Sequence, residues 1–513
     1  MNLKRFLFIF FFANLFIFFF ITGKIYYFDS PDSFDHFRRS LELSIPKTQL
    51  IENSGNTNLK GLSPSPNFIY EVNSIRSDIF EFQKENKLTN YDQKIIVGNY
   101  YQNIKELLKS KNIKDLYKEI NTNKTFQPHY LMSYSGANYL PQIITLKISY
   151  FLNTNLDMAY KLMRNGNKIL LFLIAGYCLI NLKDYFLLTP LYCLFYLTLP
   201  TSLFLFSTVS GDAGIIGSII FLTLLTEKKF KLNNYPISFS SKYNLLNLSE
   251  IIISVIALSA VMSKSAYIPI GLIIGSIYLF SIFKNNKGFL KYIFLILFSF
   301  TIVFSINWLI YTSNTAIEYF KNQVPFINPE FAISQVKTFS ITFLKAIFNT
   351  LLIDAKILLA QAIGVFGHST TMLLSPKILY LIIFIIGVLT FINPLIYLFR
   401  FNHYFNFTKI NKNNFIKIFP SFIIVLSILI SLYIMFGALW ASFTVPGSNK
   451  IEAIVGRYFL PYLPLLMLSI SLLLTNKMSK LISLNLLNRR LLTIGILLNL
   501  TFFYINLQNY YML

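Results

Sequence analysis

The chain has 513 residues, of which 54% are hydrophobic and only 13% carry a charged side chain. Soluble globular domains carry about 25% charged residues, so the composition excludes a soluble enzyme and indicates an all-α membrane protein with many spans. The formal charge of +23 does not indicate a nucleic-acid partner, because many lysines and arginines lie in short loops between apolar segments. The two cysteines, Cys178 and Cys193, lie inside apolar segments, which argues against a disulfide framework or a cysteine metal site.

The first apolar segment, residues 6–21, follows Lys4 and Arg5. No small-residue cleavage site comes after it, so we expect a retained signal-anchor with a cytoplasmic N-terminus. Residues 24 to about 139 then lie on the outer side of the membrane, and they are the most polar part of the chain. Five apolar residues of this region recur at helical spacing and predict an amphipathic helix: Ile104, Leu107, Leu108, Leu116 and Ile120.

Ten further apolar segments predict a total of about eleven transmembrane helices. They are residues 168–182, 186–206, 213–226, 249–263, 266–283, 292–311, 377–399, 418–440, 458–475 and 491–508. Alternating these spans from a cytoplasmic start places every short basic loop inside, as the positive-inside rule requires. The corresponding division is a first span (1–23), an outer loop (24–166), spans two to seven (167–311), an outer-side loop with interfacial helices (312–376) and spans eight to eleven (377–513).

The densest group of titratable residues is the stretch SPDSFDHFRRSLEL, residues 30–43, just after the first span. Ser30 before Pro31 predicts a helix N-terminus. Phe34, Phe37 and Leu41 then share one face of this helix, and the other face carries Asp32, Asp35, His36 and Arg39. An ordinary amphipathic surface helix has the same pattern, so the stretch alone leaves both interpretations open.

Four other charged residues fall on the same predicted side of the membrane. Asp212 lies between the third and fourth spans, Lys264 is at the tip of a tight hairpin, Arg164 precedes the second span, and Arg457 opens the tenth beside Tyr458. Each has an ordinary explanation as a helix cap or an interfacial anchor. Together they oppose the positive-inside bias. Acids beside a group of cations suit a site that deprotonates a hydroxyl and holds a phosphate leaving group.

Five short stretches resemble, in order, those of the bacterial membrane proteins called domain of unknown function 2142. They are PDSFDHFRR, NYLPQ, STVSGD, SKSAYIP and GRYFLPYLP. That family is similar to the GT-C superfamily of membrane glycosyltransferases, which use polyprenyl-phosphate sugar donors. The resemblance implies a GT-C-like fold and an inverting sugar transfer on the outer face, with an acid of the first outer loop as base. The family's second acidic position is Ser33 here, a departure that puts the activity in doubt unless Asp35 compensates.

The expected site therefore has three groups of residues. The catalytic candidates are Asp32, Asp35 and His36, the substrate-binding candidates are Arg39, Arg164, Asp212, Lys264, Arg457 and Tyr458, and Asp32, Asp35 and Asp212 are candidates for a divalent cation such as Mg²⁺ or Mn²⁺. The expected partners are a polyprenyl-phosphate-linked sugar, membrane lipids and an acceptor of the cell envelope, with the protein in the cytoplasmic (inner) membrane.

Three other functions stay open. A transporter or flippase of lipid-linked sugars would show ionisable residues near the middle of its spans, whereas the charges here gather at one membrane face. A polysaccharide polymerase also has many spans and outer-loop arginines, but the long loop directly after the first span fits it less well. A non-catalytic member of a surface assembly is compatible with Ser33.

Overall fold

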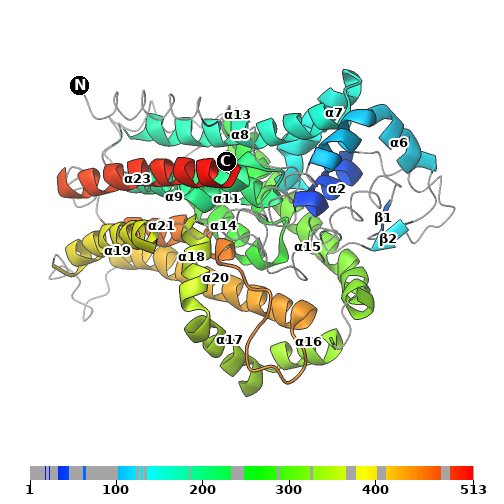
Figure 1. The fold of residues 1–513 in the computed structure, drawn as a ribbon. Coiled ribbons are helices and arrows are strands. Elements are labelled where there is room, and N and C mark those ends of the chain that lie inside the picture. Colours follow the sequence, from blue (N-terminus) through cyan, green and yellow to red (C-terminus); the bar gives the residue numbers. More distant parts are fainter. Residues whose placement is uncertain are drawn as a thin grey trace.

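The computed structural model describes residues 18, 22, 33–44, 62–64, 102–122, 126–128, 131, 134, 136–182, 184, 187–232, 248–285, 289–323, 327–364, 377–400, 412–474 and 486–511. The described part is a helical bundle (Figure 1). Its helices are α2 (Ser33–Ser44), α6 (Ile113–Thr122), α7 (Leu140–Phe151), α8 (Leu156–Asn181), α9 (Thr189–Leu197), α10 (Pro200–Ser207), α11 (Gly211–Leu232), α13 (Leu248–Val261), α14 (Ile268–Asn285), α15 (Leu290–Gln323), α16 (Pro329–Lys337), α17 (Ile341–Ile353), α18 (Ala355–Gly364), α19 (Lys377–Arg400), α20 (Lys412–Phe443), α21 (Tyr462–Leu473) and α23 (Leu486–Tyr511). Three short 3-10 helices join them: η3 (Ala137–Tyr139), η4 (Ser265–Tyr267) and η6 (Gly456–Phe459).

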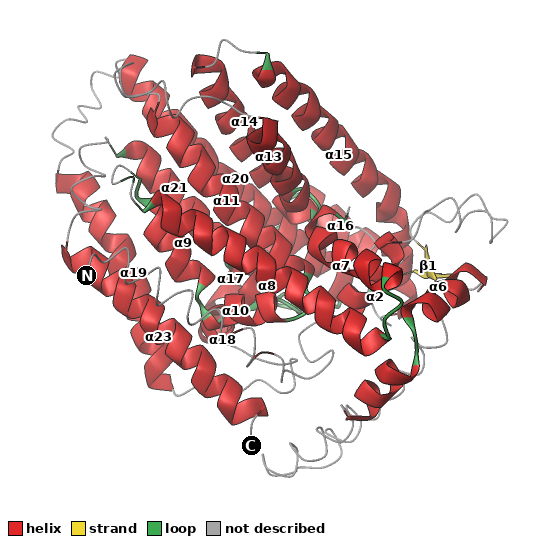
Figure 2. Ribbon diagram, turned by 90° about the horizontal axis from the view of Figure 1, so that it is seen from above, coloured by secondary structure: helices red, strands yellow, loops and turns green. Residues whose placement is uncertain are grey.

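Seen from above, the long helices α8, α11, α20 and α23 run in broadly one direction (Figure 2). Helices α2 and α6 and a small sheet lie at one end of the bundle (Figure 1). Figure 2 shows α13, α14 and α15 side by side along one flank. The sheet is one antiparallel pair, in which Leu62–Pro64 (β1) faces Phe126–Pro128 (β2). The all-α prediction missed this pair, because three-residue strands are too short to show an alternating pattern.

Each predicted span after the first falls largely within a described helix or a pair of them, but the count of eleven is not confirmed. Within the described part of the chain, four helical segments are long and apolar enough to cross a membrane: Ser265–Phe283, Leu290–Ile310, Ile418–Phe443 and Gly456–Leu473. The number rises to six if each of two bent helix pairs is a single span. The other apolar helices are shorter or carry more charge. The predicted first span lies outside the described residues except for Phe18, which packs in the main core.

The predicted span 186–206 is broken into α9 and α10, whose axes differ by 66°. Pro200 stands at the start of α10, where the missing N–H of a proline costs no hydrogen bond. The side-chain amide of Asn499 on α23 donates to the Phe195 carbonyl oxygen at 3.2 Å and to Thr198 Oγ1 at 3.3 Å. The exposed backbone of the break is therefore partly satisfied by the neighbouring helix.

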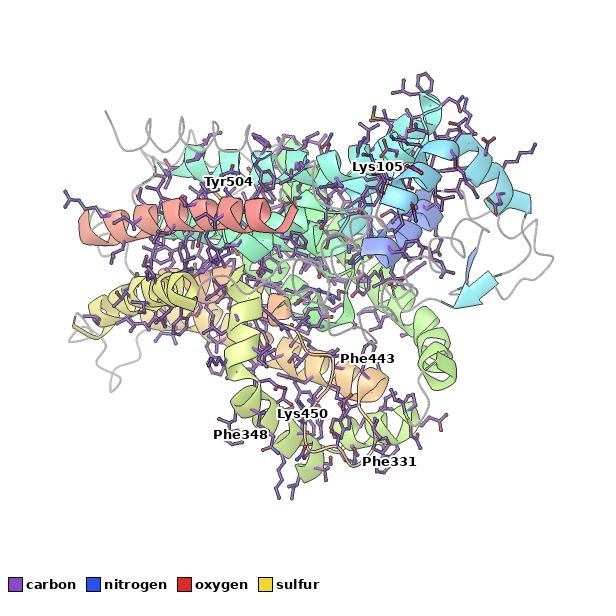
Figure 3. All side chains as sticks on the ribbon, viewed as in Figure 1. Lys105, Phe331, Phe348, Phe443, Lys450 and Tyr504 are labelled. Carbon is purple, nitrogen blue, oxygen red and sulfur yellow. The ribbon has the colours of Figure 1, made fainter. Side chains whose placement is uncertain are left out.

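Helices α16 and α17 form the second bent pair, with 94° between their axes. Sequence analysis predicts interfacial helices here. Phe343 of α17 is fully buried and packs near Trp440 of α20, with ring centroids 5.7 Å apart. The opposite side is apolar and exposed, as Phe331 and Phe348 illustrate in Figure 3. An apolar face without a protein neighbour suits helices that contact lipid.

The topology predicts that the loop after the first span and the loop before α23 lie on opposite sides of the membrane. We expect a cysteine at Lys118, an exposed residue of α6, to react with a membrane-impermeant maleimide in intact cells. A cysteine at the exposed Arg490 should react only after permeabilisation. Cys178 and Cys193 are buried and provide an unlabelled background. Labelling of both variants in intact cells would contradict the predicted orientation.

Candidate functional site

Three charged residues from distant parts of the chain meet inside the bundle. The Lys264 ammonium lies 3.5 Å from Asp212 Oδ1, and Arg457 Nε lies 3.4 Å from Asp212 Oδ2. The exposed fractions of the three side chains are only 13% for Asp212, 14% for Lys264 and 10% for Arg457. We call these residues the charged triad. It contains two cations and one anion in a poorly solvated position, so it carries one net positive charge.

Each member of the triad stands at the end of a helix. Asp212 is in the first turn of α11, Lys264 precedes η4 and α14, and Arg457 lies in η6 ahead of α21. Sequence analysis predicts that all three residues share one face of the membrane, and the structure places them in contact.

The triad stays charged over a wide pH range. Burial raises the pKa of the Asp212 carboxyl, but Lys264 and Arg457 lower it by more, and the pKa is about 2. Burial likewise lowers the pKa of Lys264, but Asp212 outweighs this effect and the pKa lies well above 10.5. Because the pKa of Asp212 is depressed, its contribution to stability is present above the unfolded pKa of about 4 and is lost only as the pH falls towards 2.

Tyrosine rings surround the Lys264 ammonium. It lies 4.5 Å from the ring centroid of Tyr458, 5.4 Å from that of Tyr134 and 5.7 Å from that of Tyr267. Cation–π contacts of this kind stabilise an ammonium group that has lost water. The Tyr267 hydroxyl also donates to the Tyr458 carbonyl oxygen at 3.2 Å, which joins η4 to η6. The rings therefore hold the lysine near Asp212.

Helix α2 is the element that brings the first outer loop to the triad. His36 Nδ1 and the Tyr139 hydroxyl are 2.6 Å apart, and both side chains are almost fully buried. Burial raises the pKa of Tyr139 well above 10, so its hydroxyl stays protonated at physiological pH. The Tyr139 ring lies against Gly211, the residue before Asp212, because a Cβ atom on Gly211 would be only 2.8 Å from Tyr139 Cζ. The His36–Tyr139 pair therefore borders the charged triad.

Arg39 lies on the same face of α2 and is also almost fully buried. Its guanidinium donates to the Tyr134 carbonyl oxygen at 2.6 Å, pairs with Glu42 at 2.7 Å and lies 5.8 Å from the ring centroid of Trp308 on α15. The apolar face of α2 packs as predicted, with Phe34, Phe37 and Leu41 in one buried cluster. Both faces of α2 are therefore covered, so it is no solvated surface helix.

Two glycines permit close backbone contacts around the triad. A Cβ atom on Gly214 would lie 2.3 Å from the Asn138 carbonyl oxygen, so η3 can approach the first turn of α11 only at a glycine. A Cβ atom on Gly456 would lie 1.9 Å from the Leu358 carbonyl oxygen. The Gly456 amide also donates to Gln361 Oε1 at 2.8 Å. This second contact fixes η6, and with it Arg457, against α18.

Substitution of Gly456 by alanine is therefore expected to destabilise the protein. Overpacking of a tight contact costs about 1–3 kcal/mol, and more where backbone atoms must move. We expect a clearly lower melting temperature of the detergent-solubilised protein by intrinsic fluorescence. Gly176→Ala on α8 is the control, because no atom lies within 4 Å of its added Cβ. Equal melting temperatures of the two variants would contradict the packing argument.

The other predicted site residues are placed as follows. Asp32 lies outside the described residues, and Asp35 is half-buried on α2. Arg164 lies within α8, where its guanidinium donates to the Ser207 carbonyl oxygen at 2.8 Å and to that of Thr22. These bonds join α8 to the end of α10, and a substrate contact of Arg164 stays a prediction.

Asp212 is poorly placed to bind a divalent cation. No group of three or more histidines, cysteines or acids in the described part of the chain is arranged to hold a metal ion. Both oxygens of Asp212 face cationic side chains, which makes it a poor ligand for Mg²⁺ or Mn²⁺. Asp35 and Asp32 stay as candidates.

Sequence reasoning missed the aromatic partners of the site. Tyr139 and Tyr267 stand inside two of the stretches that resemble the family, NYLPQ and SKSAYIP, the second of which also contains Lys264. Trp308 is one of only two tryptophans in the chain, and this rarity is the only sequence feature that could have drawn attention to it. Nothing in the local sequence distinguishes Tyr134 from the other 31 tyrosines of the chain, which has 32 in all.

The comparisons with known proteins identify a family whose match includes the sequence stretches that form the site. A family model described as predicted membrane protein (DUF2142) matches residues 28–466, which include α2, the charged triad and the start of α21. No curated protein and no solved structure showed a match. Since the match covers most of the chain, the protein belongs to the DUF2142 family of membrane proteins.

Proposed function

We propose that this protein is a GT-C-type glycosyltransferase that takes a sugar from a polyprenyl-phosphate donor on the outer face of the cytoplasmic membrane. The acceptor is a glycan, lipid or protein of the cell envelope. In the proposed reaction, a hydroxyl oxygen of the acceptor attacks the anomeric carbon of the sugar. The bond between that carbon and the donor phosphate oxygen breaks, and the hydroxyl proton passes to a carboxylate of the first outer loop, Asp32 or Asp35.

The observation that carries this proposal is the meeting of α2 with the charged triad. Inverting transfer from a phosphate donor needs a base that deprotonates the acceptor and cations that hold the leaving phosphate. The base and the cations must lie close together, on either side of the transferred sugar. The acidic stretch leads into α2. Arg39 of α2 donates to the Tyr134 carbonyl oxygen, and the ring centroid of Tyr134 lies 5.4 Å from the Lys264 ammonium. Lys264 and Arg457 both contact the carboxylate of Asp212.

The position of the cations supports a lipid-linked donor. Lys264 and Arg457 each directly precede or begin an apolar segment long enough to cross a membrane, namely Ser265–Phe283 and Gly456–Leu473. Cations at the ends of such segments lie near the depth of lipid headgroups. A polyprenyl phosphate has its phosphate at this depth and its tail in the hydrocarbon. Arginine can contact two phosphate oxygens at once, and lysine adds a point charge.

The proposal is tested with purified protein in proteoliposomes that contain a polyprenyl-phosphate sugar with a radiolabel in the sugar. The expected result is protein-dependent cleavage of the glycosyl bond, with free polyprenyl phosphate as the second product. Extracts of the producing cell envelope supply acceptors, and label should appear in envelope material. Absence of both products from a panel of such donors, with folded protein, would refute the proposal.

A flippase of lipid-linked sugars is the second candidate, and the break between α9 and α10 favours it. Discontinuous membrane helices mark the binding sites of many transporters. The break here is closed by the uncharged Asn499, and the ionisable groups lie elsewhere. The same proteoliposomes separate the two functions, because a flippase moves the labelled lipid between leaflets and leaves its glycosyl bond intact.

A further inference from the structure

Asp212 occupies the position between Lys264 and Arg457 in which an anionic ligand would bind. One carboxylate oxygen faces each cation, so the two cations do not point at an open space but at a group of this same chain. A phosphate that contacts both cations has to compete with this carboxylate. Its negative charge would also be repelled by Asp212, and two unit charges about 4 Å apart interact strongly in a poorly solvated site.

The contacts of Asp212 with the two cations are longer than hydrogen bonds of full strength between charged groups. The distances of 3.4 and 3.5 Å in the triad exceed the 2.7 Å between Arg39 and Glu42 and the 2.8 Å between Lys161 and Asp157. Charge-assisted hydrogen bonds reach their full strength at about 2.7–2.9 Å. The Lys264 ammonium donates a long hydrogen bond of 3.5 Å to Asp212 Oδ1, and a carboxylate held by such long contacts is easier to displace than a tightly bonded one.

We propose that Asp212 is an internal counter-ion for a phosphate site formed by Lys264 and Arg457. It neutralises one of the two charges when the site is empty, and a phosphate monoester or diester displaces it on binding. The negative charge on phosphate increases when the glycosyl bond breaks, which strengthens its attraction to the two cations. Asp212 competes with the product for these cations and so promotes its release. The identity of the phosphate as a polyprenyl phosphate rests on the proposed function.

This role predicts that loss of the Asp212 charge strengthens phosphate binding. We expect Asp212→Asn to bind farnesyl phosphate at least about tenfold more tightly than the native protein, in calorimetric titrations of detergent-solubilised protein at fixed ionic strength. Farnesol, which lacks the phosphate, should bind both proteins equally. Asp212→Glu keeps the charge and should bind farnesyl phosphate like the native protein. Equal or weaker binding of farnesyl phosphate by Asp212→Asn would overturn the proposal.

Asp354→Asn is the matched control. Asp354 is also a partly buried acid in a long ion pair, 3.6 Å from the ammonium of Lys450, but it belongs to the α17–α18 junction. Its loss should leave the affinity for farnesyl phosphate unchanged. If Asp354→Asn gained as much affinity as Asp212→Asn, the gain would be explained by the change in net charge of the protein, and the counter-ion role would be overturned.

Asp212→Asn removes the carboxylate that faces two buried cations and is expected to melt at a lower temperature than the native protein. Added inorganic phosphate should raise the melting temperature of this variant more than that of the native protein. If the variant does not fold, the comparison is repeated on Lys264→Gln, where Arg457 is the remaining cation. Addition of Asp212→Asn to Lys264→Gln should again increase the affinity for phosphate, and no increase would overturn the proposal.

The same titrations separate this proposal from the proposed function. If Asp212→Asn gains affinity for inorganic phosphate while neither protein prefers farnesyl phosphate to inorganic phosphate, the counter-ion role holds and the polyprenyl donor is wrong. If both proteins bind farnesyl phosphate tightly and with equal affinity, the donor class holds and the counter-ion role is wrong.

Discussion

Replacement of Arg457 by alanine is expected to remove most sugar transfer while the protein still inserts into the membrane. Loss of one preorganised donor to a developing negative charge typically lowers turnover by about a hundredfold to a thousandfold. Arg457 also balances Asp212, so its loss leaves the carboxylate with Lys264 as its remaining partner in the triad. We therefore expect both a lower turnover and weaker binding of farnesyl phosphate, measured by the cleavage assay and by calorimetry.

Replacement of Arg457 by lysine separates a phosphate ligand from an interfacial anchor. A lysine keeps the charge but loses the planar donor fork, so transfer should recover only partly. An arginine that only anchors η6 predicts the reverse: poor membrane insertion of the alanine variant and full recovery with lysine. Arg490→Ala is the control, since Arg490 is an exposed arginine at the start of α23 and lies far along the chain from the triad.

The positions of the helices could be predicted because a continuous apolar run is a local property of the sequence. The predicted span 266–283 corresponds to α14, Ile268–Asn285, and the predicted span 418–440 lies inside α20, Lys412–Phe443. The number of spans could not be predicted in the same way. The segments near α13 and α21 form helices of only 14 and 12 residues, and the run at 186–206 bends at Pro200. Apolarity alone does not show where a helix breaks.

The sequence predicts that the three residues of the charged triad share one side of the membrane, but it does not predict that they contact one another. Alternation of spans places Asp212, Lys264 and Arg457 on one face, but it does not say which loops meet. That depends on how closely η3 approaches α11 at Gly214 and η6 approaches α18 at Gly456. These are contacts between segments that lie far apart in the chain, and no local pattern encodes them.

The burial of the polar face of α2 was also unpredictable from the stretch itself. The spacing of Phe34, Phe37 and Leu41 identifies the apolar face, and the structure confirms it. The other face looks like a solvated one because it carries His36 and Arg39. Its partners, Tyr139 and Trp308, lie more than one hundred residues further along the chain. A charged helical face becomes a site only through such partners.

The largest expected effect belongs to Asp32, the acid directly before α2. If Asp32 is the general base, Asp32→Asn should lower sugar transfer by about a hundredfold to ten-thousandfold. Binding of farnesyl phosphate should not change, because the base contacts the acceptor and the phosphate is held by Lys264 and Arg457. Unchanged binding also shows that the variant is folded. Asp115→Asn on α6, an exposed acid of the same outer region, is the control and should keep full activity.

Asp35→Asn decides between the two acids of the stretch. The family resemblance implies a second acid at the position of Ser33, and Asp35 follows three residues after Asp32 and is half-buried on α2. If Asp35 compensates for Ser33, its loss lowers transfer as well, though less than the loss of Asp32. Full activity of Asp32→Asn with an inactive Asp35→Asn would assign the base to Asp35. Full activity of both variants would mean that α2 supplies no base, and the glycosyltransferase proposal would lose its catalytic group.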